Sequence, residues 1–261
     1  MAEFSKMREF TGETEAAAPS AKLTPVARDT VNDRVYRQLR EALIYGLFAP
    51  GQVLLIQDLA ASLGTSTMPV RDALSRLISE QALEALPSRS VRVPLIDQRR
   101  LDDLLHARIV IEGAALELAV QRATGAEIEE LRPLIGRYDE AMTHREAYPI
   151  EEELELNKRF HFRIYQLSGS DVLFPIIESL WLQSGPYVRA AVLKFDPMSE
   201  ISALHYHREI LAAMEVRDAA AAKRALSRDI GRAFALLRDD PMIEPAEQPQ
   251  PAKRRYRRKT Q

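Results

Sequence analysis

The sequence predicts a mainly α protein of two parts: an N-terminal winged helix-turn-helix over residues 25–94 and an all-α bundle of about six helices over residues 98–238. Two observations predict this fold class. Between residues 31 and 93, stretches with a helical spacing of apolar residues are followed by a short hairpin. The later segment keeps a helical period almost throughout and shows no strand-like alternation. The short linker of residues 93–97 is expected to couple the two parts.

The first predicted helix begins at Val31 and presents one apolar stripe, after which Gly46 and Pro50 end it. A second, shorter amphipathic helix contains Leu54, Leu59, Ala60 and Leu63. Gly64 then allows the tight bend that lets a third helix cross the second at a steep angle. This order of elements is that of a helix-turn-helix.

The third helix is predicted to start near Met68, because hydroxyl side chains that can cap a helix come just before it and Pro69 is tolerated in a first helical turn. Its predicted buried face consists of Val70, Ala73, Leu74, Leu77 and Ile78. The opposite face, which we expect to enter a DNA groove, carries Thr67, Arg71, Asp72, Ser75 and Arg76. Residues 83–86 and 91–93 are expected to pair as a wing.

The motifs of this segment resemble the winged-helix pattern of the GntR family. The matching residues are Leu39-Arg40-Glu41-Ala42-Leu43-Ile44, Gly46, Pro50-Gly51, Leu59-Ala60, Leu63-Gly64, Pro69-Val70-Arg71-Asp72-Ala73-Leu74 and Arg76-Leu77. Residues 30–238 as a whole resemble the FadR-like branch of that family, in which an FCD ligand-binding domain comes after the winged helix. The resemblance implies a sequence-specific DNA-binding transcriptional regulator and not an enzyme. It also implies a homodimer on a pseudo-palindromic double-stranded operator, with repression relieved by an effector as the default.

The chain departs from the family pattern where DNA would be read. Thr67 and Met68 stand where the family has Arg and Thr, Gln57 replaces an Arg, and Arg89-Ser90 replaces the Arg-Gly of the wing. These changes predict an unusual operator or weaker binding. Arg71 is retained, and we expect it to make the strongest DNA contact, because a guanidinium can bind guanine or phosphate through two hydrogen bonds. An exposed, solvated charge is the alternative for Arg71. The predicted DNA-contacting residues are Arg40, Ser66, Thr67, Met68, Arg71, Ser75 and Arg89.

A candidate ligand site lies in the helical part. Asn157 and His161 are four residues apart, so both project from one face of a helix. With His207 and Asp229 they resemble the FCD pattern, although Asn157 stands where the family has Asp and Asp229 where it has a third His. The resemblance implies a divalent metal held by these four residues, with a small carboxylic acid as effector. The donor set suits zinc, nickel or manganese alike. The alternative is a pair of core histidines hydrogen-bonded to Asn157 and Asp229.

Arg108 and Glu112, four residues apart, match the Arg-x-x-x-Glu of the FCD pattern. Arg108 is the candidate effector-binding residue, because an inward guanidinium can clamp a carboxylate. The alternative is an ion pair that holds this helix to its neighbours. Tyr165 is interpreted as a core residue.

Composition excludes several classes of protein. The 261 residues include no cysteine, which excludes disulfides and thiolate metal sites. No apolar run is long enough for a membrane helix or signal peptide, so we expect a cytoplasmic protein without a membrane partner. Residues 1–24 and the basic segment 241–261 are predicted to be disordered tails, and the second could contact DNA phosphates.

Two other functions stay open at this point. One is a non-sensing DNA-binding dimer with a purely structural bundle. The other, less favoured, is an all-α metalloenzyme built on His161, His207 and Asp229. The sequence contains no His-Glu-x-x-His, no glycine-rich phosphate loop and no serine elbow, so nothing in it supplies such an enzyme with a catalytic base.

Overall fold

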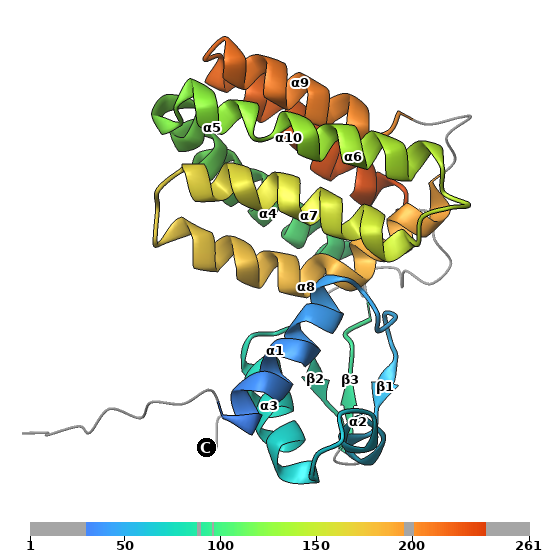
Figure 1. Ribbon diagram of the computed structural model, residues 1–261. Helices are drawn as coiled ribbons and strands as arrows, with labels where there is room; N and C mark the ends of the chain where they lie inside the picture. Colours follow the sequence, from blue (N-terminus) through green and yellow to red (C-terminus); the bar gives the residue numbers. More distant parts are fainter. Residues whose placement is uncertain (1–29, 88–89, 96, 196–200, 239–261) are drawn as a thin grey trace, which may run out of the picture.

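The computed structural model describes residues 30–87, 90–95, 97–195 and 201–238. The predicted fold class is confirmed, because these residues form a winged helix-turn-helix next to a helical bundle (Figure 1). The two predicted tails and the wing residue Arg89 lie outside the described residues. Within the described ranges, none of the helices combines the length and the apolar character that a membrane span requires.

The N-terminal part is built from helices and two-residue strands. These are α1 (Val31–Ile44), β1 (Val53–Leu54), α2 (Ile56–Ser62), α3 (Thr67–Ser79), β2 (Glu84–Ala85) and β3 (Val91–Arg92). β3 lies between the other two strands and pairs antiparallel with both. A capping box formed by Thr30 and Asp33 begins α1, because each side chain accepts a hydrogen bond from the backbone N–H of the other.

Two boundaries differ from the sequence prediction. Leu54, expected in the second helix, lies in β1, where it pairs with Val91 and is buried. Leu55 is extended, and α2 starts only at Ile56. The strands of the wing are also shorter than predicted. Apolar spacing alone does not distinguish a buried two-residue strand from the first turn of a helix, which explains the error at Leu54.

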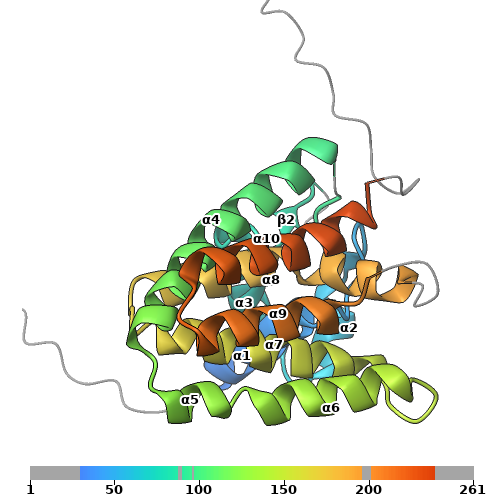
Figure 2. The same ribbon diagram turned by 90° about the horizontal axis from the view of Figure 1, so that it is seen from above.

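The bundle begins after Asp97, whose side chain caps its first helix. Its helices are α4 (Gln98–Arg122), α5 (Gly125–Glu129), α6 (Arg132–Thr143), α7 (Ile150–Leu167), α8 (Leu173–Lys194), α9 (Ala203–Glu215) and α10 (Ala219–Ala235). The short α5 is additional to the helices expected from the sequence. α10 packs against α9 and α4, and α7 packs against α4 and α6 (Figure 2). The centre of the bundle therefore lies among α4, α7, α9 and α10.

α8 joins the two parts of the molecule. Its Leu182 is buried in the core that α1 and α3 form. A Cβ atom at Gly185 would overlap the carbonyl oxygens of Leu43 and Ile44, so only glycine lets α1 approach α8 this closely. Gly46, at a φ of +62°, turns the chain away directly after α1. The two parts are thus in direct contact, in addition to the linker from which coupling was predicted.

Candidate DNA-binding surface and candidate metal centre

The outward face of α3 is the first candidate site. The inner face of α3 packs on the core through Val70, Ala73, Leu74 and Leu77, as predicted. On the other side Ser66, Met68, Arg71 and Ser75 are exposed, and Thr67 is half-buried. In a helix-turn-helix, the N-terminal end of the second helix reaches the base edges of the major groove. The predicted residues of α3 therefore lie on or beside one surface.

Arg71 is available to a partner outside the chain. It has no hydrogen bond or ion pair to any residue that the structure describes. Arg76, on the same helix, lies 3.2 Å from the carboxylate of Glu80 and 3.6 Å from the centre of the Tyr36 ring. Of these two arginines, Arg71 is the one whose guanidinium is free to bind guanine or phosphate.

Arg40 does not share this surface. Its guanidinium lies 3.6 Å from the carboxylate of Glu178 on α8, and its side chain is only 22% exposed. The side chain of Arg40 lies where α1 meets α8, so its predicted DNA contact stays a prediction that the outward face of α3 does not support. The predicted contact of Arg89 concerns a residue outside the described ranges and stays a prediction.

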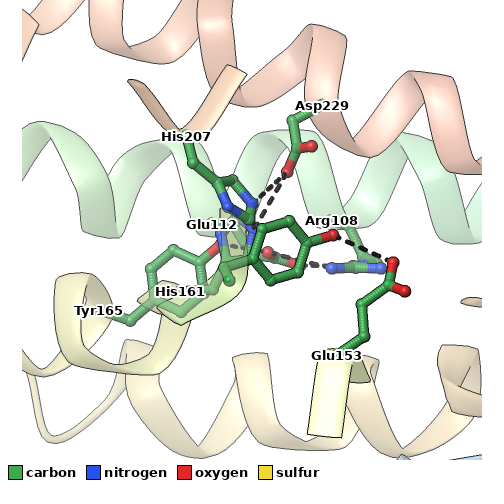
Figure 3. Close-up of polar contacts among 8 residues, drawn as sticks. Arg108, Glu112, Glu153, His161, Tyr165, His207 and Asp229 are labelled. Atoms are coloured by element: carbon green, nitrogen blue, oxygen red, sulfur yellow. Dashed lines mark hydrogen bonds and ion pairs between the residues drawn. The ribbon is translucent and has the colours of Figure 1, made fainter. Parts of the chain in front are cut away.

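The second candidate site lies inside the bundle, where His161, His207 and Asp229 converge from α7, α9 and α10 (Figure 3). The Nε2 atoms of the two histidines are 3.1 Å apart. Oδ2 of Asp229 lies 3.0 Å from Nε2 of His161 and 3.6 Å from Nε2 of His207. Ligand atoms of a tetrahedral zinc ion are about 3.4 Å apart, given bonds of about 2.1 Å. The ligand atoms of the three buried groups lie within 4.8 Å of one another, which is close enough for one such ion to bind all three.

Burial and charge set the protonation of this cluster. Burial lowers the pKa of His207, against the opposing effect of Asp229, so the imidazole is held neutral. Burial opposes the ionisation of Asp229, but His207 and the hydrogen bond from His161 hold the pKa of Asp229 well below its usual range. An ionised carboxylate beside a neutral imidazole is the state in which both groups can bind a metal.

A second layer of polar residues orients His161. The Tyr165 hydroxyl donates a hydrogen bond to Glu112 and lies 3.3 Å from Nδ1 of His161. The hydrogen bond to Asp229 requires a proton on Nε2 of His161. If the proton moves to Nδ1, the tyrosine oxygen can accept from it, and the Nε2 lone pair becomes available to a metal ion in place of the hydrogen bond to Asp229. Glu112 also accepts from Nε of Arg108 at 2.6 Å. Arg108 thus lies in a buried ion pair, with one edge of its guanidinium occupied (Figure 3).

Asn157 is not joined to this cluster. It lies one turn before His161 on α7, is half-buried, and has no polar contact with any residue in the described ranges. The alternative in which Asn157 hydrogen-bonds a core histidine is therefore not observed. The contact of Tyr165 with His161 and Glu112 was not predicted from the sequence. The available signal was its position four residues after His161, the same spacing that singled out Asn157.

A further buried carboxylate, Glu153, lies two turns before His161 on α7. Tyr138 donates to it at 3.4 Å, and the guanidinium of Arg145 lies 2.9 Å away. Burial raises the pKa of Glu153, although Arg145 and Tyr138 favour the charged form. Glu153 could not be identified from the sequence, because nothing near it in the chain distinguishes it from the glutamates beside it.

Known proteins resemble the chain over both parts. Residues 31–93 match the family model of bacterial regulatory proteins of the gntR family, and residues 103–232 match the FCD domain. The HTH-type transcriptional regulator McbR of Escherichia coli K12 is 30% identical over 204 residues, which are 78% of this chain and 91% of McbR. The Nta operon transcriptional regulator of Aminobacter aminovorans is 34% identical over 133 residues, 51% of this chain and 61% of that protein.

Solved structures agree with these matches. The structure of E. coli McbR/YncC has a TM-score of 0.72 at 29% identity and covers 80% of this chain and 98% of that chain. A putative GntR regulator from Rhodococcus sp. RHA1 has the same fold, with a TM-score of 0.64 at 24% identity over 79% and 97% of the two chains. The family and these relatives are transcriptional regulators and not enzymes. The chain therefore belongs to the GntR family of DNA-binding transcriptional regulators and carries an FCD domain as its C-terminal part.

Proposed function

We propose that this regulator is a homodimeric repressor that senses a small carboxylic acid through a divalent metal ion in its FCD domain. The observation that carries the proposal is the convergence of His161, His207 and Asp229, whose ligand atoms lie within 4.8 Å of one another. Two imidazole nitrogens and one carboxylate oxygen suit zinc, nickel or manganese, and three protein ligands leave positions open for another ligand. Asn157, half-buried and without a described polar partner on the same helix face as His161, is assigned as a fourth donor.

The charges of the site explain why the effector and the ion belong together. Arg108 is paired with Glu112, and the ionised Asp229 lies directly beside the two histidines, so the negative charge of Asp229 repels a carboxylate that approaches their Nε2 atoms. A divalent ion reverses this sign and supplies Lewis-acid positions that bind carboxylate oxygens. We therefore expect effector binding to require the ion. In this proposal Arg108 supports the site through Glu112 and Tyr165 instead of clamping the effector.

Repression and dimerisation are inferred from relatives and from DNA geometry. RspR of E. coli K12, 25% identical over 201 residues, is named a transcriptional repressor. A homodimer would place two α3 helices on the half-sites of a pseudo-palindromic operator, about one turn of DNA apart. An effector that binds one arrangement of the dimer more tightly shifts the population towards it, by an amount that its differential affinity sets.

Metal analysis of the untagged protein tests the proposal. We expect about one equivalent of metal per chain, lost in His161→Ala and in Asp229→Ala. His205→Ala is the matched control, because His205 lies two residues before His207 but is 54% exposed and faces Glu209 instead of the cluster. Protein that contains no metal and takes up none of zinc, nickel or manganese in calorimetric titrations would contradict the proposal.

The competing function is a DNA-binding dimer whose bundle has only a structural role. One observation favours it: His161 and Asp229 already lie within hydrogen-bond distance of each other. A thermal-shift screen of carboxylic acids, with and without added metal, separates the two functions, because a ligand that binds only the folded state raises Tm. Acids that raise Tm only when metal is present support the sensor, and acids without effect in either condition support the structural bundle.

A further inference from the structure

We infer that Met68 reads a thymine methyl group in the operator, and that this apolar contact acts beside Arg71 to determine the DNA sequence that is bound. The inference concerns the operator and does not depend on the proposed metal or effector.

Met68 is the apolar exception on the outward face of α3. It is 61% exposed in the first turn of the helix, and the exposed residues that share this face are Ser66, Arg71, Asp72, Ser75 and Arg76. Single exposed apolar side chains are ordinary on protein surfaces, and one methionine is too small for a protein-docking patch. Met68 lies at the N-terminal end of α3, the end of a recognition helix that enters the major groove, so a base is the partner within its reach.

Duplex DNA offers an apolar group of the right kind at that place. In the major groove, thymine presents its C5-methyl group to apolar side chains, whereas the other bases are distinguished by their hydrogen-bonding atoms. The thioether of Met68 is only a weak acceptor, so it cannot read those hydrogen-bonding atoms well. Its unbranched, flexible chain can adjust to the position of a methyl group. Thymine is therefore the base that Met68 can recognise.

The spacing of Met68 and Arg71 predicts how their two bases are arranged. Residues three apart lie next to each other on a helix face and about 4.5 Å apart along its axis. Base pairs follow each other at intervals of about 3.4 Å. A thymine that Met68 contacts should therefore lie one or two base pairs from a guanine that Arg71 contacts, and each half-site should contain this pair.

A methyl-deletion scan tests the inference. The full-length protein is first used to select operators from a random duplex library. Each thymine of a selected half-site is then replaced singly by deoxyuridine, which lacks only the methyl group. For the wild type we expect one position per half-site at which the loss of the methyl group raises Kd about fourfold. This factor corresponds to the ~0.8 kcal/mol gained when one methyl group is buried. In Met68→Ala, that position should lose its sensitivity while the other positions keep theirs.

Two controls exclude indirect effects. Met68→Ala should keep the Tm of the wild type, because the side chain is exposed. Val216→Ala should keep the deoxyuridine profile of the wild type, because Val216 is 74% exposed but directly follows α9 in the bundle. Equal losses for the wild type and Met68→Ala at every thymine would overturn the inference. Selection of no operator at all would overturn it as well, together with the assignment of α3 as the reading helix, and the metal analysis would be unaffected.

Discussion

Arg71 on α3 and Arg108 on α4 are both helical arginines, but their surroundings are opposite. Arg71 is exposed and has no polar partner among the described residues. Arg108 is buried, bonded to Glu112 and placed over the ring of Trp181. An exposed charge contributes little to folding and stays available to an external ligand. A buried charge is tolerated only because its partner is buried with it. The same residue type therefore marks a binding surface in one region and an internal support in the other.

The contrast extends from these two residues to their regions. The outward face of α3 presents side chains to a ligand that the chain does not contain. The polar groups at the centre of the bundle contact one another, through His161, Asp229, Tyr165 and Glu112. Substitutions on the outward face of α3 should therefore change DNA affinity without changing stability, whereas substitutions of buried polar groups in the bundle should change stability first.

The largest effect is expected from Glu112→Ala. The substitution leaves Arg108 buried without its partner and removes the acceptor of Tyr165, so the free energy of unfolding should fall by about 3–5 kcal/mol. Urea denaturation measures the change. Glu117→Ala is the matched control on the same helix, because the ion pair of Glu117 with Lys223 is exposed and should be worth about 0–1 kcal/mol. Equal losses in the two variants would contradict the contrast between buried and exposed pairs.

A smaller effect is expected where the two regions touch. Gly185→Ala places a methyl group against the carbonyl oxygens of Leu43 and Ile44, so α1 and α8 must move apart at a cost of about 1–3 kcal/mol. Gly231→Ala on α10 is the control, because a Cβ atom there meets no atom within 4 Å and alanine favours helix by about 1 kcal/mol. In thermal denaturation, Tm should fall for Gly185→Ala and rise for Gly231→Ala. A gain in Tm for Gly185→Ala would show that the contact of α1 with α8 is loose.

Arg71→Ala should leave the free energy of unfolding unchanged and weaken operator binding by about 1–3 kcal/mol. Fluorescence anisotropy with a selected operator measures the second quantity. Arg76→Ala is the matched control on α3, because Arg76 is held by Glu80 and Tyr36. If both variants weaken operator binding equally, then pairing of Arg76 with Glu80 and Tyr36 does not keep its guanidinium from contacting DNA.

The sequence predicted most of the helix-turn-helix because its signals are local. The glycine after the second helix, the capping residues before Pro69 and the apolar spacing of α3 act within a few residues of one another. The errors concern residues whose positions depend on distant partners. Leu54, for example, is in a strand because Val91 pairs with it. The position of Arg40 beside Glu178 of α8 likewise depends on a residue far away in the chain.

In the bundle too, contacts between residues far apart in the chain could not be predicted from the sequence. His161, His207 and Asp229 could be named from the sequence because the family pattern marks them, and the structure brings them together. The role of Tyr165 could not, because it depends on Glu112, 53 residues earlier in the chain. A spacing of four residues shows that two side chains share a face, but only the packing of other helices shows whether that face is buried.

The smallest effect on stability is expected from Glu153→Gln, which replaces a buried carboxylate that has two partners, Tyr138 and Arg145. Burial raises the pKa of Glu153, so the native state binds more protons than the unfolded state at pH values between the unfolded and the native pKa. The corresponding contribution to stability is complete below the ordinary carboxyl pKa and is lost as the pH rises through the raised native pKa. Glu153→Gln removes this titration and keeps the shape of the side chain.

The stability of Glu153→Gln relative to the wild type should therefore increase as the pH is raised from about 4 to about 7, which Tm measurements across this range can follow. Glu152→Gln is the matched control, because Glu152 is adjacent in sequence but pairs with Arg137 at the surface. A difference in Tm that decreases with rising pH would mean that Arg145 stabilises the charged carboxylate more than burial opposes it. In that case Glu153 and Arg145 would form a second buried pair of the kind that Arg108 and Glu112 form, and removing either partner should then be as costly as Glu112→Ala.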